Sequence, residues 1–177
     1  MPYEHLWAPW RLGYIMGDEP AVGASPAVKL LPGGEPGCFL CQAAVEGDDR
    51  RKLVVHRGPH SVTMLNRYPY NNGHLLLAPR RHVARLDQLE PREQLDLTAT
   101  IAQMIGRLER VLKAEGFNVG LNLGRAAGAG LPGHLHWHVV PRWPGDTNFM
   151  PATAAVRVIP QSLDALWEAL GAEIKKG

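Results

Sequence analysis

A row of three histidines near the end of the sequence is the feature most able to do chemistry. His134, His136 and His138 alternate with apolar residues. In a strand, successive side chains point to opposite faces, so the three imidazoles would share one face and the apolar residues the other. Imidazole handles protons or metal ions near neutral pH. One imidazole can attack phosphorus while a neighbour holds its tautomer or protonates the leaving oxygen, so the row predicts nucleophilic and acid–base catalysis.

Two other interpretations of the row stay open at this point. A surface strand can carry alternating polar residues without any chemistry, although three histidines in strict alternation make this the weaker explanation. The three imidazoles could also bind one metal ion. Alternate strand residues lie about 6 to 7 Å apart, which strains simultaneous ligation of one ion. The spacing therefore favours a nucleophile with a proton donor.

A glycine-rich loop, Gly124-Arg-Ala-Ala-Gly-Ala-Gly130, comes just before the row. Glycine lets backbone N–H groups approach phosphate oxygens closely, so Gly128 and Gly130 are candidate phosphate-binding residues. Such a loop is equally typical of a flexible connector. Its position next to three histidines favours phosphate binding.

The only two cysteines of the sequence, Cys38 and Cys41, are separated by two residues. In a reducing compartment this spacing indicates a shared metal ion or a redox pair rather than a structural disulfide. Two cysteines cannot complete a zinc site, so further ligands would have to come from elsewhere in the chain.

Composition predicts one globular domain without a broad polyanion-binding surface. The chain has 177 residues, of which 45% are hydrophobic, so we expect a single domain over residues 1–177. The net charge is only +2, so we expect no nucleic-acid partner, and any anion site must be local. No apolar run reaches the roughly 20 residues that span a bilayer, and the N-terminus lacks a signal-peptide pattern. We therefore expect a cytoplasmic protein without a membrane partner.

Sequence periodicity predicts a sheet that would hold these residues, with two helices against it. Apolar or alternating runs bounded by turn residues predict antiparallel strands over residues 52–57, 61–66, 74–79, 117–124 and 134–142. Pro91 begins a long helix whose apolar residues recur at helical spacing until Gly116. Ser162 caps a C-terminal helix. The expected fold class is α+β.

Two N-terminal segments fall outside this pattern. Residues 17–37 are rich in Gly, Pro and Ala without apolar periodicity, which predicts a loop or mobile arm. Residues 6–15 (LWAPWRLGYI) are more apolar than a free tail tolerates. We expect them to dock onto the body of the protein or onto a second subunit.

The row His134-Leu-His136-Trp-His138-Val-Val resembles the signature of the histidine triad family, in which three histidines alternate with apolar residues. The resemblance extends to residues 66–74 (NRYPYNNGH) and 122–124 (NLG). Members of this family are nucleotide hydrolases, phosphorylases and nucleotidyl transferases with an α+β fold, usually homodimers. The resemblance therefore implies a nucleotide substrate, a homodimer and no organic cofactor.

Matching positions imply roles for individual residues. His136 corresponds to the family nucleophile, which attacks the α-phosphorus, and His138 to the residue that binds the α-phosphate or helps the leaving group. Asn66 matches a residue that holds the ribose hydroxyls, and Asn122 matches an amide that contacts phosphate or ribose. His74 matches a supporting histidine, although a hydrogen-bonded core residue is an equal alternative.

A zinc site is also implied by the resemblance. Several histidine triad proteins are similar at the positions of Cys38, Cys41, His82 and His134, which would make a four-ligand structural zinc site. His134 thus has two assignments, one in the catalytic row and one as a zinc ligand. A simple reduced pair of cysteines is the alternative.

Further motifs resemble one bacterial branch that includes diadenosine tetraphosphate phosphorylases. They include residues 116–124 (GFNVGLNLG) and 141–149 (PRWPGDTNF). The predicted function is cleavage of dinucleoside polyphosphates at the α-phosphate through a nucleotidyl-histidine intermediate. One alternative is a hydrolase of nucleoside phosphoramidates or acyl-nucleotides. Another, from a different class, is a non-catalytic nucleotide-binding module.

Small residues in the loop predict that inorganic phosphate, rather than water alone, accepts the nucleotidyl group. Many related hydrolases place a polar side chain four positions before the first triad histidine, where this chain has Gly130. The space and the backbone N–H donors suit a second anion. Arg125 and Arg142 could add positive charge, although solvated surface arginines are an equal alternative.

Overall fold

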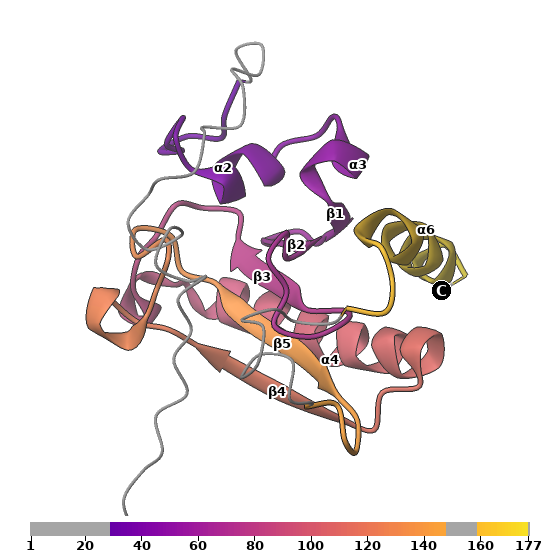
Figure 1. Cartoon of the computed structure of the whole chain (residues 1–177). Helices are drawn as coiled ribbons and strands as arrows, with labels where there is room; N and C mark the ends of the chain where they lie inside the picture. Colours follow the sequence, from indigo (N-terminus) through magenta and orange to yellow (C-terminus); the bar gives the residue numbers. More distant parts are fainter. Residues whose placement is uncertain (1–28, 148–158, 177) are drawn as a thin grey trace, which may run out of the picture.

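Five strands form one antiparallel sheet, in agreement with the sequence pattern. The structure is a computed structural model that describes residues 29–147 and 159–176. Neighbouring strands are hydrogen-bonded in the order β1-β2-β3-β5-β4. The strands are β1 (Val54–Arg57), β2 (Ser61–Leu65), β3 (Leu75–Pro79), β4 (Gly116–Leu121) and β5 (Trp137–Arg142). The helices and 3-10 turns in Figure 1 are α2 (Phe39–Ala43), α3 (Asp49–Lys52), η1 (Leu86–Gln88), α4 (Pro91–Leu112), η2 (Arg125–Ala127) and α6 (Leu163–Ile174).

The two longer helices begin where the sequence predicts. Pro91 occupies the first turn of α4, and Glu90 and Glu93 form a capping box that satisfies backbone N–H groups there. Ser162 Oγ accepts a hydrogen bond from the Ala165 N–H and caps α6. Helix α4 ends before Gly116 because Lys113 adopts a left-handed conformation, which releases the chain into β4.

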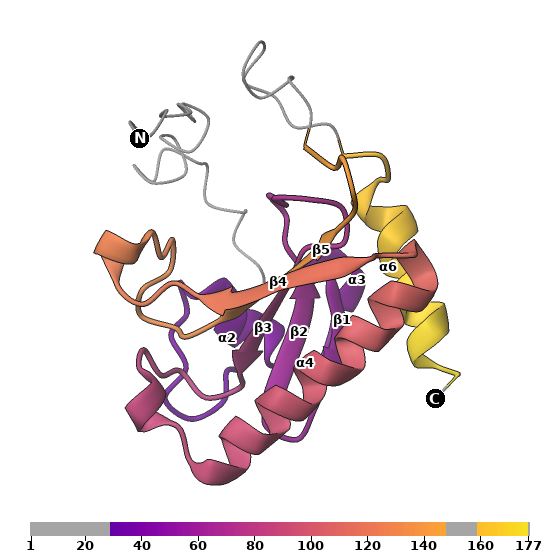
Figure 2. The ribbon, with the colours of Figure 1, turned by 90° about the horizontal axis from the view of Figure 1, so that it is seen from below.

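The sheet separates two apolar layers. On one face, α4 and α6 pack together against the strands, with Leu108 and Leu170 fully buried over Leu65, Leu75 and Val139. Figure 2 shows α4 crossing the sheet obliquely with α6 beside it. On the other face, residues of α2 cover the first three strands in a separate buried cluster of Cys38, Leu40, Cys41, Ala43, Ala44, Val54, Val62, Met64, Leu76 and Ala78. The predicted α+β class, with one long and one C-terminal helix, is confirmed.

Strand β5 begins at Trp137, three residues later than the sequence predicts. The β3–β5 register pairs Leu77 with Trp137, so continued pairing would place Pro79 opposite Leu135. Proline has no N–H to donate to the ladder. The Leu135 N–H instead donates to the Val83 carbonyl at 2.7 Å, so residues 134–136 run beside the segment that follows β3.

The alternation of the row nevertheless survives in the packing. Leu135 and Trp137 contact an apolar cluster with Leu77 and Leu97, and Val139 belongs to the cluster under α4. His138 pairs in register with Leu76, whose side chain lies on the α2 side of the sheet. The histidines therefore lie on the face opposite α4.

Some predictions concern residues outside the described part. The docking of residues 6–15 and the first part of the 17–37 loop cannot be compared, whereas residues 29–37 contain turns without helix or strand. Within residues 29–147 and 159–176, no helix combines the length and apolar character that crossing a bilayer requires.

Candidate active site and metal cluster

His136 is held in one tautomer by the backbone. Its Nδ1 lies 2.8 Å from the carbonyl oxygen of His134. A carbonyl only accepts hydrogen bonds, so Nδ1 carries the proton and the lone pair of the neutral ring sits on Nε2. His136 is only 7% exposed, and this burial lowers the pKa of its imidazole. The lower pKa favours the neutral form of the ring. The residue thus presents an unprotonated imidazole nitrogen.

A chain of hydrogen bonds sets the tautomer of His138. The Tyr70 N–H donates to His74 Nδ1 at 3.0 Å, so neutral His74 carries its proton on Nε2. His74 Nε2 lies 3.0 Å from His138 Nδ1 and donates to it. When His138 is neutral, its own proton is therefore on Nε2. The His138 ring lies 5.2 Å from that of His136 between centroids, so an imidazole N–H stands beside an imidazole with an unprotonated nitrogen.

A tight turn between β2 and β3 builds this chain. Asn66 Nδ2 lies 3.2 Å from His74 Nδ1, and Asn66 Oδ1 accepts the Tyr68 N–H at 3.0 Å. Gly73 in the turn has a φ of +76°, and a Cβ there would lie 2.5 Å from Leu112 Cδ1. Only glycine fits this position, so the turn that places Asn66 and His74 depends on it.

The turn is tied to the end of β5. Asn71 Nδ2 donates to Asp146 Oδ2 at 2.8 Å and to the Pro141 carbonyl at 3.2 Å. Asp146 also accepts two bonds from Arg142, which holds the pKa of this carboxyl well below its usual range. Arg142 further donates to Asn118 Oδ1 at 2.7 Å. Its guanidinium is thus engaged in this network, and a contribution of its charge to a second phosphate stays a prediction.

The remaining nucleotide-binding candidates divide into two groups. The side-chain amide of Asn122 reaches the site, with Nδ2 3.5 Å from His138 Nε2. Gly128 and Gly130 lie in an exposed loop around η2. The Gly128 N–H donates to the Arg125 carbonyl within that loop. In the described residues, no hydrogen bond joins this loop to His136 or His138, so its phosphate-binding role stays a prediction.

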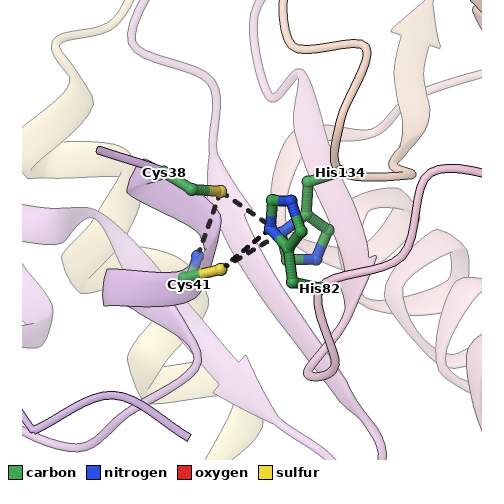
Figure 3. Close-up of side chains that lie close together, drawn as sticks. All are labelled: Cys38, Cys41, His82 and His134. Carbon is green, nitrogen blue, oxygen red and sulfur yellow. Dashed lines mark hydrogen bonds between the residues drawn. The ribbon is translucent and has the colours of Figure 1, made fainter. Parts of the chain in front are cut away.

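The imidazole of His134 lies in a cluster with His82 and both cysteines (Figure 3). Its Nδ1 lies 3.2 Å from Cys38 Sγ and 3.5 Å from Cys41 Sγ. His82 Nδ1 lies 3.2 Å from Cys41 Sγ. One ligand atom from each of the four residues falls within 4.8 Å of the others. The structure thus brings the four residues of the predicted metal set together, and the imidazole of His134 contacts both cysteines.

A hydrogen bond to His134 and a carboxylate beside His82 orient the two imidazoles of this Cys/His cluster for metal binding. His134 Nε2 donates to the Pro79 carbonyl at 2.9 Å, and His82 Nε2 lies 3.3 Å from a Glu35 carboxylate oxygen. Each ring therefore turns the lone pair of its Nδ1 toward the sulfurs.

The chemistry of the cluster also fits a cation. Burial lowers the pKa of His134 to about 4, which keeps the ring neutral, and burial raises the pKa of the Cys38 thiol to about 12. A bound cation would offset the cost of a buried thiolate. Two sulfurs and two imidazole nitrogens are a donor set that zinc accepts in tetrahedral sites. The four residues can thus hold a metal ion.

Two contributors were not identified from the sequence. Tyr70 supplies the N–H that starts the hydrogen-bond chain, and its ring stacks on His138 with centroids 5.7 Å apart. Its place in the turn before Gly73 was visible, but a backbone donor leaves no sequence signal. Glu35 has a carboxylate oxygen 3.3 Å from His82 Nε2 and lies in the Gly/Pro-rich segment that was predicted to be a loop.

The row of His134, His136 and His138 at the start of an antiparallel strand, backed by His74, is the arrangement that the resemblance to the histidine triad family implies. A family model described as HIT domain matches residues 49–145. The chain belongs to the HIT family. Cys38 and Cys41 lie before the matched residues, whereas His82 and His134 lie within them.

Comparisons with individual proteins agree with this class. AP-4-A phosphorylase of Mycobacterium tuberculosis is 41% identical over 164 residues, which cover 90% of this chain and 78% of that protein. The asymmetrical bis(5'-nucleosyl)-tetraphosphatase of Schizosaccharomyces pombe is 36% identical over 93 residues, 52% of this chain and 50% of that protein. Plasmodium falciparum diadenosine triphosphate hydrolase, solved in complex with cyclomarin A, shares the fold with a TM-score of 0.60 and 17% identity over 92% of this chain and 95% of that one. The chain is accordingly a HIT-family enzyme.

Proposed function

We propose that the protein cleaves dinucleoside polyphosphates, such as diadenosine tetraphosphate, at the α-phosphate through a nucleotidyl-histidine on His136. The observation that carries this proposal is the hydrogen bond from His136 Nδ1 to the His134 carbonyl, which leaves a lone pair on Nε2. A neutral imidazole with its reactive nitrogen prepared in this way is suited to nucleophilic attack on phosphorus. The relationship to AP-4-A phosphorylase supports the choice of substrate class.

The reaction would proceed in two displacements at phosphorus. His136 Nε2 attacks the α-phosphorus and forms a nitrogen–phosphorus bond, while the phosphoanhydride bond to the leaving polyphosphate breaks. His138 donates a hydrogen bond from its Nε2–H to the leaving oxygen, because the bond from His74 fixes the proton on that nitrogen, and the polyphosphate leaves as an anion. An acceptor oxygen then attacks phosphorus, breaks the nitrogen–phosphorus bond and regenerates His136.

Asn66, Asn122 and the loop with Gly128 and Gly130 are proposed to bind the nucleotide. His138 Nε2–H and Asn122 Nδ2 would both act as donors 3.5 Å apart, and a phosphate oxygen is an acceptor that satisfies both. Asn66 lies at the other end of the hydrogen-bond chain, through His74, where it would meet the ribose.

We infer that inorganic phosphate accepts the nucleotidyl group, so that diadenosine tetraphosphate gives ATP and ADP. The small residues around Gly130 and the relationship to a phosphorylase support this choice. The test is product identity after incubation with diadenosine tetraphosphate and labelled phosphate. Label in ADP is the expected result. Unlabelled AMP plus ATP at every phosphate concentration would make the protein a hydrolase, and turnover of adenosine phosphoramidate alone would overturn the substrate class.

We propose that the Cys/His cluster binds one structural zinc ion. Buried, unoxidised cysteines beside two imidazoles support this assignment, and free thiols suit a reducing compartment such as the cytoplasm. When bound, zinc would crosslink α2 to the segments that carry His82 and His134. Protein purified without chelator should contain about one zinc per chain, because structural zinc binds tightly enough to survive purification. Less than roughly a tenth of an equivalent would contradict the site.

A homodimer is proposed to form at the β4 edge of the sheet. Among the described strands β4 pairs only with β5, and Val119 on this strand is 43% exposed. An open edge with apolar side chains favours pairing with a second copy.

A further inference from the structure

His134 takes part in both sites with different parts of the same residue. Its imidazole lies 3.2 Å from Cys38 Sγ in the Cys/His cluster. Its backbone carbonyl accepts the Nδ1–H of His136 at 2.8 Å. Any displacement of this residue would therefore change the hydrogen bond that fixes the tautomer of the nucleophile.

The 134–135 peptide unit, which carries this carbonyl, is held on both sides by contacts that lead to the Cys/His cluster. On one side is the His134 side chain, which is fully buried. On the other side, the Leu135 N–H belongs to the same peptide unit and donates to the Val83 carbonyl at 2.7 Å. Val83 directly follows His82, the other imidazole of the cluster. Both anchors thus lead to the same four residues.

Regular secondary structure does not supply this anchoring. His134 and His136 precede β5, and His82 and Val83 lie between β3 and η1. The exposed glycine-rich loop leads directly into His134, whose own N–H makes a 3.4 Å contact with the Leu131 carbonyl. The two irregular segments therefore meet at the Cys/His cluster, which is where a bound ion would crosslink them.

We propose that a metal ion in the Cys/His cluster positions the catalytic nucleophile, with His134 as the positioning residue that connects the two. The proposal rests on the zinc site and the nucleophile of the proposed function. Metal ligation holds His134 and His82 in place, these hold the 134–135 peptide, and the peptide carbonyl keeps the proton of His136 on Nδ1. Loss of the ion would free the carbonyl and let the imidazole sample the other tautomer, with Nε2 protonated and unable to attack.

The first test compares protein loaded with one equivalent of Zn²⁺ with protein stripped by a chelator, well below the unfolding temperature of the stripped form. Nitrogen-15 NMR of the imidazoles reports the tautomer of His136 independently of turnover. We expect a Nδ1–H signal in the loaded protein and a mixture of tautomers in the stripped one. In the same samples kcat with diadenosine tetraphosphate should fall about 10- to 100-fold, the range for groups that orient a functional ligand. KM should change far less, and Zn²⁺ should restore both readouts.

His82→Asn provides a second route that leaves His134 and both cysteines in place. The control is His60→Asn, a partly buried histidine in the β1–β2 loop outside both sites. His82→Asn should reproduce the stripped protein, and His60→Asn should behave like the wild type. If His82→Asn fails to fold, the chelator comparison still decides.

An unchanged tautomer and a kcat within about threefold after metal removal would overturn the proposal. Protein that takes up no Zn²⁺ would overturn it as well, without affecting the activity assay of the proposed function. Conversely, a tautomer that follows Zn²⁺ in a protein inactive on every dinucleoside polyphosphate would support the positioning role and refute only the assigned activity.

Discussion

Replacement of His74 by phenylalanine tests whether the hydrogen-bond chain behind His138 directs catalysis. His74 is 1% exposed, and phenylalanine keeps a ring in this buried position. The substitution removes the acceptor for the Tyr70 N–H and the donor to His138 Nδ1, each a bond of 3.0 Å. His138 would then be free to carry its proton on Nδ1, where it faces the wrong way for the leaving oxygen.

The size of the effect follows from the bonds removed. Each buried polar group left without a partner costs about 1 to 3 kcal/mol, and the half-buried Tyr70 belongs at the lower end. We expect the free energy of unfolding to fall by about 2 kcal/mol. Loss of a group that orients a catalytic imidazole lowers activity about 10- to 100-fold, or about 1.4 to 2.8 kcal/mol in barrier. The loss should appear in kcat more than in KM.

The assay is a double-mutant cycle on kcat, with unfolding in urea measured on the same samples. His74→Phe should lower kcat strongly in the wild type but little in a His138→Ala background, because both changes remove the same proton donor. His56→Phe on β1, a half-buried histidine away from the site, serves as the matched control. Equal effects of His74→Phe in both backgrounds, or a folded variant with unchanged kcat, would refute the tautomer argument.

Three further predictions concern the nucleophile, a buried ion pair and the sheet edge. His136→Ala should abolish turnover while nucleotide binding measured by calorimetry persists; activity within about tenfold of the wild type would remove the nucleophile assignment. Hydrogen bonds from Arg81 lower the pKa of Glu93, so its contribution to folding is present above the unfolded-state pKa of about 4.3 and lost as pH falls through the lower folded value. Urea unfolding should therefore show that Glu93→Gln lowers the free energy of unfolding by about 1 to 2 kcal/mol at pH 7 and by much less near pH 3. The effect is limited because the Arg81 side chain is partly exposed to solvent. An equal loss at both pH values would contradict the ion-pair explanation. Val119→Lys should shift the protein toward monomer in analytical ultracentrifugation, and an unchanged sedimentation coefficient would place the dimer interface elsewhere.

The elements of the fold were readable from local sequence because their signals are local. The helix from Pro91 was predicted from helical spacing and a proline at its start, and both determine the observed α4. The strands followed from apolar runs between turn residues. The start of β5 was placed too early because the register that brings Pro79 opposite Leu135 depends on strand pairing, which local periodicity does not contain.

The sequence predicted which residues form the candidate active site but not the hydrogen bonds and ring contacts between them. His136 and His138 stand out by their alternation, and the turn containing Asn66 and His74 was recognised by resemblance. The tautomers were not predictable, because they depend on which backbone group each ring nitrogen meets. The stacking of Tyr70 on His138 likewise arises only when the turn folds over β5.

By itself the sequence determined the fold class, the nucleophile candidate and the four residues of the metal set, since these depend on residue type, spacing and resemblance. Only the tertiary structure decided how His134 is used. Its alternation with His136 predicted a shared face, and on that face its imidazole contacts cysteines 93 and 96 residues earlier in the chain, which no local pattern contains. Contacts at such separations depend on how the sheet and α2 pack, and burial of the imidazole among sulfurs requires that packing. The proposed division of the row into a catalytic pair and a metal ligand therefore rests on contacts that only the folded protein makes.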